Sequence, residues 1–412
     1  MNKVLDRSAV ATAAGALALL AAGIGIASGT VGALIILLIG YYSIFLWARG
    51  AKESLQPAVQ FAALYGLVLL ACGIAIWKYS PPIDALAYVS SADRIAASGL
   101  SSTDYASPAV MVDGKSGYVL FLATVTFLLG GGPYVAIAMN AVAIMWLLII
   151  CARTADSLGS CHPHRASFAV ALFPGLLLWG SPPLREAAVV LCIGIIVDAS
   201  VQLSARARLG GAWMRLVGAS LALLVLRGSL GVVVPVAALL SIFIAEKEKS
   251  RVAVVPLGLT AIAAVWAIAP SIVSSTLSRT DPTIVAVSLE ELSRSSSGFT
   301  QSSGPIGRIA AVARVLLGPF PWELGSAGIS SLEAPVWIAA TILAISRVRS
   351  HGRQVAVPAL IGLSIALAIA ISVGNYGTLL RMRLMIIPCL AVLLSLGSRT
   401  KSPKLLPDEM TP

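Results

Sequence analysis

Long apolar runs separated by short polar loops constrain this chain more than any other feature. A helix needs roughly 20 apolar residues to cross a bilayer, and continuous rather than alternating runs favour helices over barrel strands. The candidate spans are 8–28, 30–48, 58–77, 133–152, 166–180, 186–203, 213–226, 229–245, 252–275, 334–346, 354–374 and 379–397. The sequence therefore predicts an all-α integral membrane protein, in which residues 1–412 form one polytopic bundle of about 12 transmembrane helices.

Composition excludes an ordinary soluble protein. Hydrophobic residues make up 58% of the chain and charged residues 11%, whereas soluble domains carry about 25% charged residues. A net charge of +11 would suggest a nucleic-acid partner for a soluble protein, but here the basic residues lie in short loops between apolar runs. We therefore expect contact with membrane lipid and no binding of nucleic acid.

Orientation depends on one further apolar run, 117–130, which is followed by Gly131-Gly132-Pro133. If this run lies in the membrane plane, the arginine-rich loops at 204–215, 246–251 and 347–353 face the cytoplasm, as the positive-inside rule favours. If it spans the membrane, those loops face outward, and this alternative stays open. The first arrangement predicts a multi-pass protein of the cell inner membrane with cytoplasmic N- and C-termini.

Two long segments then lie outside the membrane. We expect the functional chemistry there, because long loops in compact proteins are usually functional or disordered. Residues 78–132 are predicted to form an outer loop with juxtamembrane, in-plane helices. Residues 276–333 are predicted to form a second outer loop, partly flexible at its serine-rich stretches and carrying a short interfacial helix near 309–317. The sequence contains neither a P-loop nor a glycine-rich dinucleotide fingerprint.

The first candidate site residues follow a Pro-Pro turn at the start of the first outer loop. Asp84 and Tyr88 recur at helical spacing and are expected to share one face, and Asp93 and Arg94 follow them. An acid just outside the membrane can act as a general base on an acceptor hydroxyl, or hold a divalent metal ion against a phosphate. A helix-capping role for Asp84 is the alternative.

Two further candidates lie where the chain turns at the outer surface. Arg185 and Glu186 follow a second Pro-Pro turn at the start of a predicted helix, whose N-terminus favours an acid or a bound anion. Arg227 stands in a tight turn between two apolar runs, and its guanidinium suits a phosphate. Snorkelling of the two arginines to the interface is the alternative.

The last candidates lie near the outer ends of the C-terminal spans. Trp322 and Glu323 belong to a proline-rich turn, for which an aromatic interface belt is the alternative. Asn375 precedes Arg381 and Arg383, two arginines placed on the outer side against the positive-inside trend. Something negative should meet these arginines, either protein carboxylates or a lipid-linked phosphate.

Three of these stretches together resemble bacterial membrane glycosyltransferases of the GT-C superfamily, in particular its family-39-like and oligosaccharide repeat-unit polymerase group. The resemblance covers roughly residues 80–397. It rests on Phe173-Pro174 to Trp179 with Arg185-Glu186, on Pro319-Phe320-Pro321-Trp322-Glu323 with Glu333 downstream, and on Asn375-Tyr376-Gly377 with Arg381 and Arg383. The group often has Lys and Asp at the positions of Arg185 and Glu186, and it carries paired acids where Ala85 follows Asp84 here.

This resemblance implies a GT-C-like fold and an inverting glycosyl transfer on the outer face of the cytoplasmic membrane, in cell-envelope polysaccharide assembly. The implied donor is a polyprenyl-phosphate-linked sugar or oligosaccharide, with envelope-assembly proteins as further candidate partners. It implies Asp84 and Glu186 as catalytic residues. The substrate-binding candidates are Tyr88, Asp93, Arg94, Arg185, Arg227, Trp322, Glu323, Asn375, Arg381 and Arg383. No cofactor is fixed, and a divalent cation, Mg²⁺ or Mn²⁺, stays open because the second acid is missing.

Two other classes stay open as well. A transporter or flippase of lipid-linked oligosaccharides would carry polar residues through the bundle centre, whereas Asp198 is the single acid at mid-membrane depth. A non-catalytic membrane protein of envelope assembly would have Asp84, Glu186, Arg227 and Arg381 dispersed rather than gathered. The arrangement of these side chains therefore distinguishes the hypotheses.

Overall fold

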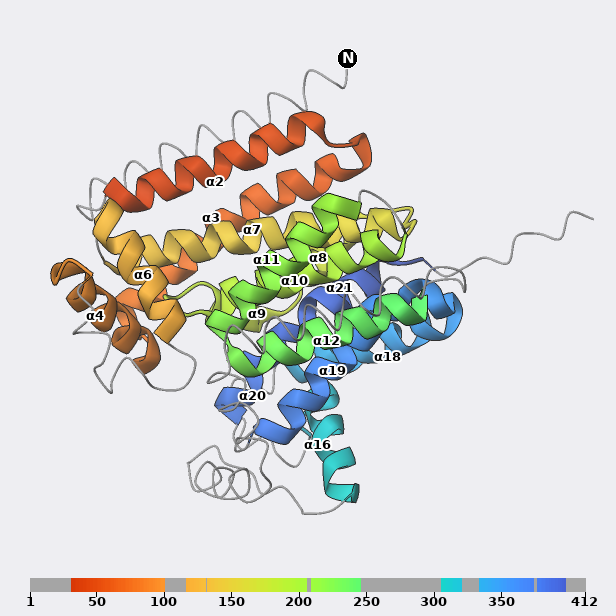
Figure 1. The fold of residues 1–412 in the computed structure, drawn as a ribbon. Helices are drawn as coiled ribbons and strands as arrows, with labels where there is room; N and C mark the ends of the chain where they lie inside the picture. The colour runs from red at the N-terminus through yellow and green to blue at the C-terminus, as the bar shows by residue number, and fades with distance from the viewer. Residues whose placement is uncertain are drawn as a thin grey trace, which may run out of the picture.

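The computed structural model describes residues 31–100, 116–130, 132–205, 209–245, 305–320, 333–373 and 376–397, which contain helices and no strand (Figure 1). The helices are α2 (Val31–Gly50), α3 (Gln56–Tyr79), α4 (Ile83–Ala97), α6 (Ser116–Leu129), α7 (Pro133–Ser157), α8 (His164–Ala171), α9 (Pro174–Gly180), α10 (Glu186–Ser204), α11 (Leu209–Leu226), α12 (Gly228–Ala245), α16 (Pro305–Leu317), α18 (Ala334–His351), α19 (Ala356–Ser372), α20 (Tyr376–Arg383) and α21 (Ile387–Ser395). Short 3-10 turns are η1 (Glu53–Leu55), η4 (Gly352–Val355) and η5 (Leu384–Ile386). The predicted spans 8–28 and 252–275 lie outside the described residues.

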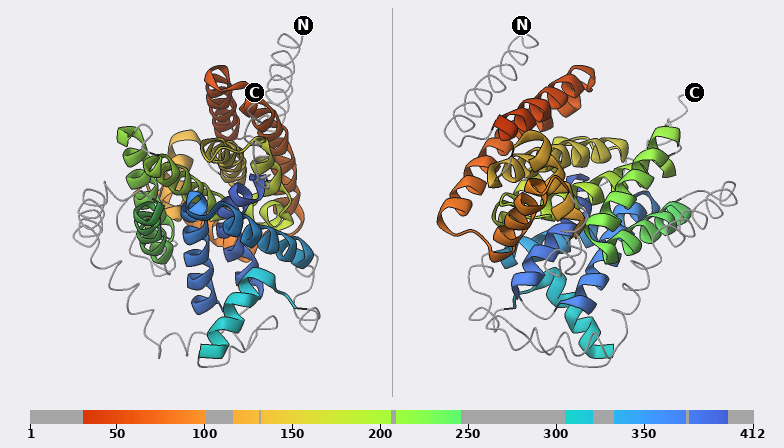
Figure 2. Two further views of the ribbon diagram at one scale, coloured as in Figure 1. Left: turned by 90° about the vertical axis from the view of Figure 1, so that its right-hand side faces the viewer. Right: turned by 60° about the vertical axis from the view of Figure 1, so that its left-hand side comes forward.

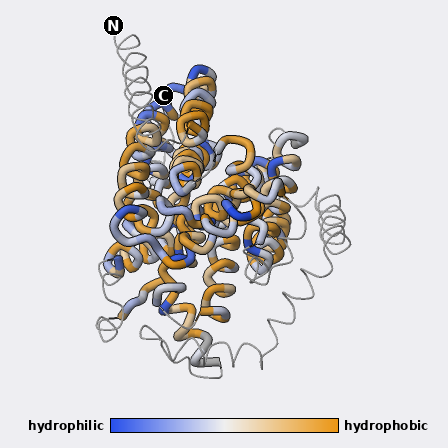
Figure 3. The backbone as a smooth tube through the Cα atoms, turned by 90° about the vertical axis from the view of Figure 1, so that its left-hand side faces the viewer, coloured by the Kyte–Doolittle hydropathy of each residue, from blue (hydrophilic) through white to orange (hydrophobic). Residues whose placement is uncertain are grey.

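Seven helical segments of the described ranges are long and apolar enough to cross a membrane. They are Val31–Gly50, Glu53–Tyr79, Pro133–Ser157, Glu186–Ser204, Gly228–Ala245, Ala334–Ser372 and Tyr376–Ser395. Figure 3 shows hydrophobic residues along most of the helical tube. The chain is thus a multi-pass helical membrane protein, as predicted.

α7 is the central helix of the bundle. In its most apolar stretch 83% of the residues are buried, against 39% for α2 at the periphery. α2, α3, α8 and α10 pack around it, and Figure 2 shows α7 between the N-terminal helices and the later ones. Small buried residues along α7, such as Ala136, Ala138 and Ala141, allow the neighbouring helices to pack closely against it.

Contacts between α3 and α7 show that these two helices run antiparallel. Ala58 near the start of α3 packs with Ala152 near the end of α7. Gly73 near the end of α3 lies against Ile137 near the start of α7. The bundle therefore has two opposite ends, and the end of each helix can be assigned to one of them.

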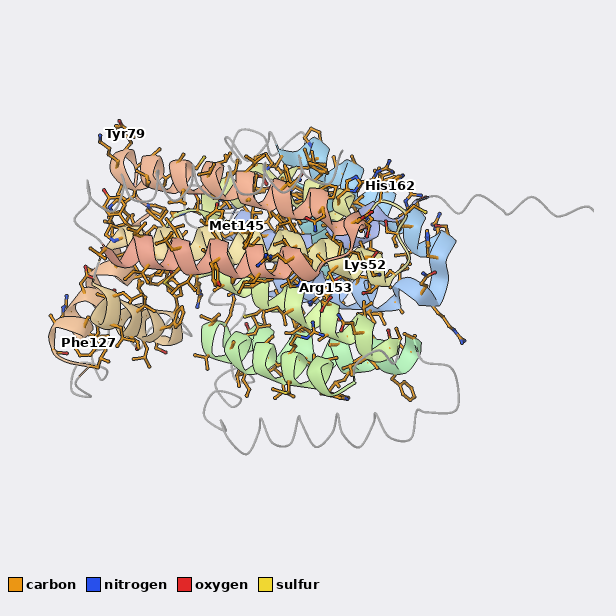
Figure 4. The ribbon with its side chains drawn as sticks, turned by 90° about the horizontal axis from the view of Figure 1, so that it is seen from above. Lys52, Tyr79, Phe127, Met145, Arg153 and His162 are labelled. Carbon is orange, nitrogen blue, oxygen red and sulfur yellow. The ribbon has the colours of Figure 1, made fainter. Side chains whose placement is uncertain are left out.

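We name these ends after residues that Figure 4 labels. Lys52, Arg153 and His162 gather at one end, called the Lys52 end, and Tyr79 and Phe127 lie at the opposite end, called the Tyr79 end. Lys52 pairs with Asp156 at 2.7 Å, which fixes the turn before α3 to the end of α7.

α4 and α6 lie at the Tyr79 end and do not cross the bundle (Figure 1). Gly117, at the start of α6, lies against Val225 at the end of α11. Leu129, at the other end of α6, lies against Gly32 at the start of α2. Since both ends of α6 meet the same end of the bundle, this helix lies across that end.

Prolines divide two of the predicted spans into shorter helices. Pro174 separates α8 from α9 within 166–180, because proline has no N–H to continue the hydrogen bonding of α8. The span predicted at 379–397 consists of α20, η5 and α21, with Pro388 in the first turn of α21. The breaks leave two short helices, α9 and α20, that carry Trp179 and Arg381.

Candidate functional site

Arg381 lies at the centre of an ion-pair network. Its Nη1 contacts Oδ2 of Asp84, and its Nε and Nη2 donate to Oε1 of Glu186 at 3.2 and 2.8 Å. Asp84 and Glu186 lie 297 and 195 residues from Arg381 in the chain. One guanidinium from α20 thus joins carboxylates from α4 and α10.

Asp84 is the accessible acid of this network. Pro82 precedes α4 in an extended conformation, so the helix begins at Ile83 and Asp84 falls in its first turn, where an acid is favoured. The side chain of Asp84 is 35% exposed, whereas that of Glu186 is 1% exposed. Asp84 is therefore the carboxylate that solvent and an acceptor reach directly, and Glu186 lies deeper in the same network.

Two more arginines stand beside Glu186. Nη1 of Arg227, in the turn between α11 and α12, lies 3.9 Å from Oε1 of Glu186. Burial, followed by the charge of Arg185, lowers the pKa of Arg227 to about 10. Arg185 donates from Nη1 to the carbonyl of Leu226 at 3.0 Å, which ties the turn before α10 to the end of α11.

We call these five residues, Asp84, Arg185, Glu186, Arg227 and Arg381, the Arg381 cluster. Two carboxylates meet three guanidinium groups, so the cluster carries an excess of positive charge. Such an excess in a partly enclosed site favours an anionic ligand.

Aromatic side chains line the Arg381 cluster. The Trp179 ring lies 5.6 Å from the guanidinium of Arg381, and Tyr88 packs edge-on against Tyr118 at 5.4 Å. Burial raises the pKa of both tyrosines, and the Glu186 carboxylate adds to the increase. Sequence reasoning named Tyr88 but missed Tyr118, whose only signal was its place at the start of the in-plane run.

Asp93 and Arg94 do not lie in the Arg381 cluster. Both side chains are exposed on α4, away from the face that Asp84 and Tyr88 share. Asp93 instead accepts a hydrogen bond from the backbone N–H of Gly132, just ahead of α7. The structure therefore gives these two residues no place beside the other candidates.

The C-terminal candidates separate from one another. Trp322, Glu323 and Asn375 lie outside the described residues. Arg383 is only two residues from Arg381, yet it is fully buried and lies over the Trp337 ring at 4.3 Å. The predicted pair of arginines thus faces two different environments.

A second buried group surrounds Arg383. Trp337 donates from Nε1 to Oε2 of Glu333 at 3.3 Å, and Phe173 packs on the Trp337 ring at 4.7 Å. Glu333 also accepts the backbone N–H of Gly175, and burial raises its pKa. Residues from all three stretches of the resemblance therefore meet, but Phe173, Glu333 and Arg383 do so apart from the Arg381 cluster.

Asp198 forms a third charged group, toward the Lys52 end. Its Oδ1 accepts from Nε of Arg153 at 3.0 Å, and its Oδ2 accepts from Nη1 of Arg215 at 2.8 Å. Thr154 and Gln202 add further hydrogen bonds to the same carboxylate. The single intramembrane acid that the sequence singled out is thus fully engaged by neighbouring side chains.

The acids of the Arg381 cluster do not fit a divalent cation in this arrangement. Among the described residues, no group of three or more His, Cys, Asp or Glu side chains stands close enough to hold a metal ion. Asp84 and Glu186 both contact the same guanidinium, which occupies the position that a shared cation would take.

Comparisons with known proteins leave the site to be interpreted from its own geometry. No protein-family model, no curated protein and no solved structure matches this chain.

Proposed function

We propose that this protein is a membrane glycosyltransferase of GT-C type that uses a polyprenyl-phosphate-linked sugar or oligosaccharide as donor. The observation that carries the proposal is the joining of Asp84 and Glu186 through Arg381, with Arg227 beside them. An accessible carboxylate next to excess guanidinium charge supplies the two groups that such a transfer needs. These are a base for the acceptor hydroxyl and a cation for the phosphate.

We further propose that twelve helices cross the membrane and that the Tyr79 end faces outward. Ten crossings would be made by α2, α3, α7, α8 with α9, α10, α11, α12, α18, α19, and α20 with α21, and two by the predicted spans 8–28 and 252–275. Basic residues at or near the Lys52 end, which support a cytoplasmic placement of that end, are Arg49, Arg153, Arg165, Arg215, Arg347, Arg349 and Arg353. Both termini would then be cytoplasmic, in the cell inner membrane.

In the proposed reaction, Asp84 takes the proton of the acceptor hydroxyl as its oxygen attacks the anomeric carbon of the donor. The bond from that carbon to the phosphate oxygen breaks, and the lipid phosphate leaves with the bonding electron pair. Arg381 stabilises the negative charge on this leaving group. Since Arg381 contacts Asp84 before substrate arrives, an incoming phosphate competes for the guanidinium and releases the base.

Two observations favour this proposal over the other classes. The engagement of Asp198 by Arg153 and Arg215 removes the one intramembrane acid that an ion-coupled transporter would use as a relay. The convergence of Asp84 and Glu186 on one arginine is the opposite of the dispersal expected for a non-catalytic membrane protein of envelope assembly.

The test is transfer by the full-length chain in proteoliposomes. A panel of synthetic polyprenyl-phosphate-linked hexoses and pentoses is supplied with a cell-envelope glycan extract as acceptor, and released polyprenyl phosphate is measured. Asp84→Asn is expected to lower kcat by about 10²–10⁴-fold, the usual contribution of a general base.

Asp93→Asn is the matched control, because it makes the same chemical change on the same helix at an exposed position outside the Arg381 cluster. It is expected to retain wild-type transfer. A wild-type protein that releases no polyprenyl phosphate from any donor would overturn the proposed function. Equal activity of Asp84→Asn and wild type would remove Asp84 as the base.

A further inference from the structure

Three polar atoms at the Arg381 cluster are buried and have no hydrogen-bond partner in the described part of the chain. They are Oε2 of Glu186, Nη1 of Arg227 and the hydroxyl of Tyr118. Glu186 and Tyr118 are each 1% exposed. Buried polar groups are nearly always paired, so these three unpaired atoms call for a partner that the chain itself does not supply, either a ligand group or an ordered water.

The geometry allows one ligand atom to reach the two charged groups together. Oε1 of Glu186 is taken by Arg381, which leaves Oε2 for another partner. Nη1 of Arg227 lies 3.9 Å from Oε1, too far for a direct hydrogen bond. Two hydrogen bonds of about 2.8 Å through a shared oxygen span roughly 5.6 Å, enough to bridge the arginine and the carboxylate.

Tyr118 supplies the third buried atom without a hydrogen-bond partner among the described residues. It lies in α6, and its ring packs against Tyr88 of α4 at 5.4 Å. Gly117, the residue before Tyr118, lies against Val225, two residues before Arg227, so the start of α6 lies beside the turn that carries Arg227. Helix α6 therefore contributes a polar atom to the same place as α10 and the turn after α11.

The chemistry of these atoms selects the ligand. Oε2 of an ionised Glu186 only accepts hydrogen bonds, and Nη1 of Arg227 only donates them. A phosphate oxygen satisfies the arginine but is repelled by the carboxylate, and an ammonium group satisfies the carboxylate but is repelled by the arginine. A hydroxyl donates to Oε2 and accepts from Nη1, and the Tyr118 hydroxyl can complete its remaining bond.

We propose that Glu186, Arg227 and Tyr118 form a subsite for one hydroxyl of the donor sugar, separate from the phosphate contact at Arg381. The inference rests on the proposed function, since the donor supplies the hydroxyl. It gives Arg227 a neutral partner in place of the phosphate suggested by its sequence context. It also makes the subsite a determinant of sugar specificity, because only a sugar with a hydroxyl in this position completes the set.

The experiment uses the donor that the wild-type protein accepts, together with analogues in which each ring hydroxyl is replaced in turn by hydrogen or by fluorine. Donor binding is followed by thermal stabilisation of the protein, and kcat/KM is measured in proteoliposomes. One ring position is expected at which the deoxy donor loses about 10- to 100-fold in kcat/KM, the value of one hydrogen bond to a charged group. Fluorine cannot donate to Oε2, so the fluoro donor is expected to fail at the same position.

Two variants test the assignment. Glu186→Gln can keep its carbonyl oxygen toward Arg381 and turn its amide toward the subsite, which replaces the acceptor by a donor. Tyr118→Phe removes one hydroxyl and leaves every contact of Arg381 in place. Glu186→Gln is expected to shrink the loss caused by the deoxy donor to within about threefold. Tyr118→Phe keeps the bonds to Glu186 and Arg227, so it is expected to shrink that loss only by about two- to tenfold, the value of one neutral hydrogen bond.

Tyr65→Phe is the matched control, because Tyr65 is another buried tyrosine whose hydroxyl has no partner in the described residues, on α3 and outside the Arg381 cluster. Tyr65→Phe is expected to show the same loss of kcat/KM with the deoxy donor as the wild-type protein. Equal use of all deoxy donors by the wild type would mean that the subsite holds water only, and the inference would be overturned while the proposed function stood. A loss that neither Glu186→Gln nor Tyr118→Phe reduces would also overturn it. If the wild-type protein neither binds nor transfers any donor, both proposals are overturned.

Discussion

Two buried acids on α10, each flanked by arginines, differ in how completely their charge is matched. Both oxygens of Asp198 accept hydrogen bonds, with Arg153 and Arg215 as the ionic partners. Glu186 has one oxygen bonded to Arg381 and a second oxygen without a partner among the described residues. The two carboxylates are 12 residues apart on the helix, about 18 Å along its axis at 1.5 Å per residue.

This difference shows which buried charges are candidates for function. A network in which every group is satisfied holds helices together and leaves nothing for a ligand to bind. A network with an unmatched acceptor beside an unmatched donor is complete only when something else enters. The Asp198 group is therefore interpreted as structural and the Arg381 cluster as a binding site, although both begin as isolated acids in apolar sequence.

Among the tests of this contrast between the two buried acids, the largest expected effect comes from removing the shared arginine of the Arg381 cluster. Arg381→Ala leaves Asp84 and Glu186 without their common partner and, under the proposed function, takes away the cation for the leaving phosphate. We expect kcat/KM for the donor to fall by about 10²–10³-fold, the usual cost of one such electrostatic contact. The measurement is polyprenyl phosphate release in proteoliposomes, with donor affinity followed in parallel.

Arg94→Ala provides the control, since Arg94 is an exposed arginine at the same end of the bundle and outside the Arg381 cluster. It is expected to change kcat/KM less than twofold. Unchanged donor affinity in Arg381→Ala would contradict the phosphate contact.

The complementary substitution at the other acid tests the structural interpretation. Asp198→Ala should lower the free energy of unfolding by about 2–3 kcal/mol, less than the 3–5 kcal/mol of a fully buried pair. The reason for the smaller value is that Arg153 and Arg215 are 27% and 32% exposed and can turn toward solvent. Denaturant unfolding in detergent measures the stability, and transfer per folded molecule is expected to stay at the wild-type level.

Asp156→Ala is the control for this change. Asp156 pairs with Lys52, whose side chain is 74% exposed, and such surface pairs contribute about 0–1 kcal/mol. If Asp198→Ala abolished transfer in protein that remained folded, Asp198 would also be a functional residue, and its interpretation as a structural acid would be wrong.

A smaller effect is expected at the arginine that the sequence paired with Arg381. Arg383 is fully buried over Trp337 and away from the Arg381 cluster. None of the three guanidinium nitrogens of Arg383 has a hydrogen-bond partner among the described residues, so no hydrogen bond offsets the cost of burying this charge, and an apolar side chain of similar size avoids that cost. Arg383→Met is therefore expected to keep transfer within about threefold of wild type and to change the free energy of unfolding by roughly 1 kcal/mol or less. A loss of transfer as large as that of Arg381→Ala would restore Arg383 as a substrate contact.

Apolar run length was enough to predict most of the described helices. The predicted spans at 30–48, 58–77 and 133–152 correspond to α2, α3 and α7, and the run at 117–130 corresponds to α6. The division of 166–180 into α8 and α9 was not predicted, because an apolar run shows hydrophobicity but not whether Pro174 ends one helix or starts the next. Charge asymmetry, a global signal, favoured a run at 117–130 that does not cross the bundle, which local hydrophobicity could not distinguish from a span.

The candidate site was predictable in its charged members and not in its pairings. Asp84, Glu186, Arg227 and Arg381 stood out because charged residues at the edges of apolar runs are costly. The separation of Arg383 from Arg381 was invisible, since it depends on how a short helix turns between other helices. Tyr118 and Trp179 were not singled out as site residues because aromatic residues are common in membrane helices, and only packing reveals what they touch.

The smallest expected effect lies at Trp179, whose ring is 5.6 Å from the guanidinium of Arg381. Neither arginine that pairs with Asp198 has such an aromatic contact among the described residues. Substitution of Trp179 therefore tests whether an aromatic ring holds Arg381 in position for a ligand. A cation–π contact at a partly exposed site contributes about 0.5–1 kcal/mol, so Trp179→Leu should raise KM for the donor about two- to fivefold. Trp179→Phe keeps an aromatic face, so its KM for the donor is expected to lie between those of Trp179→Leu and the wild type. A loss with Trp179→Leu as large as that of Arg381→Ala would instead make the ring a direct substrate contact, because orienting one arginine does not account for so large an effect.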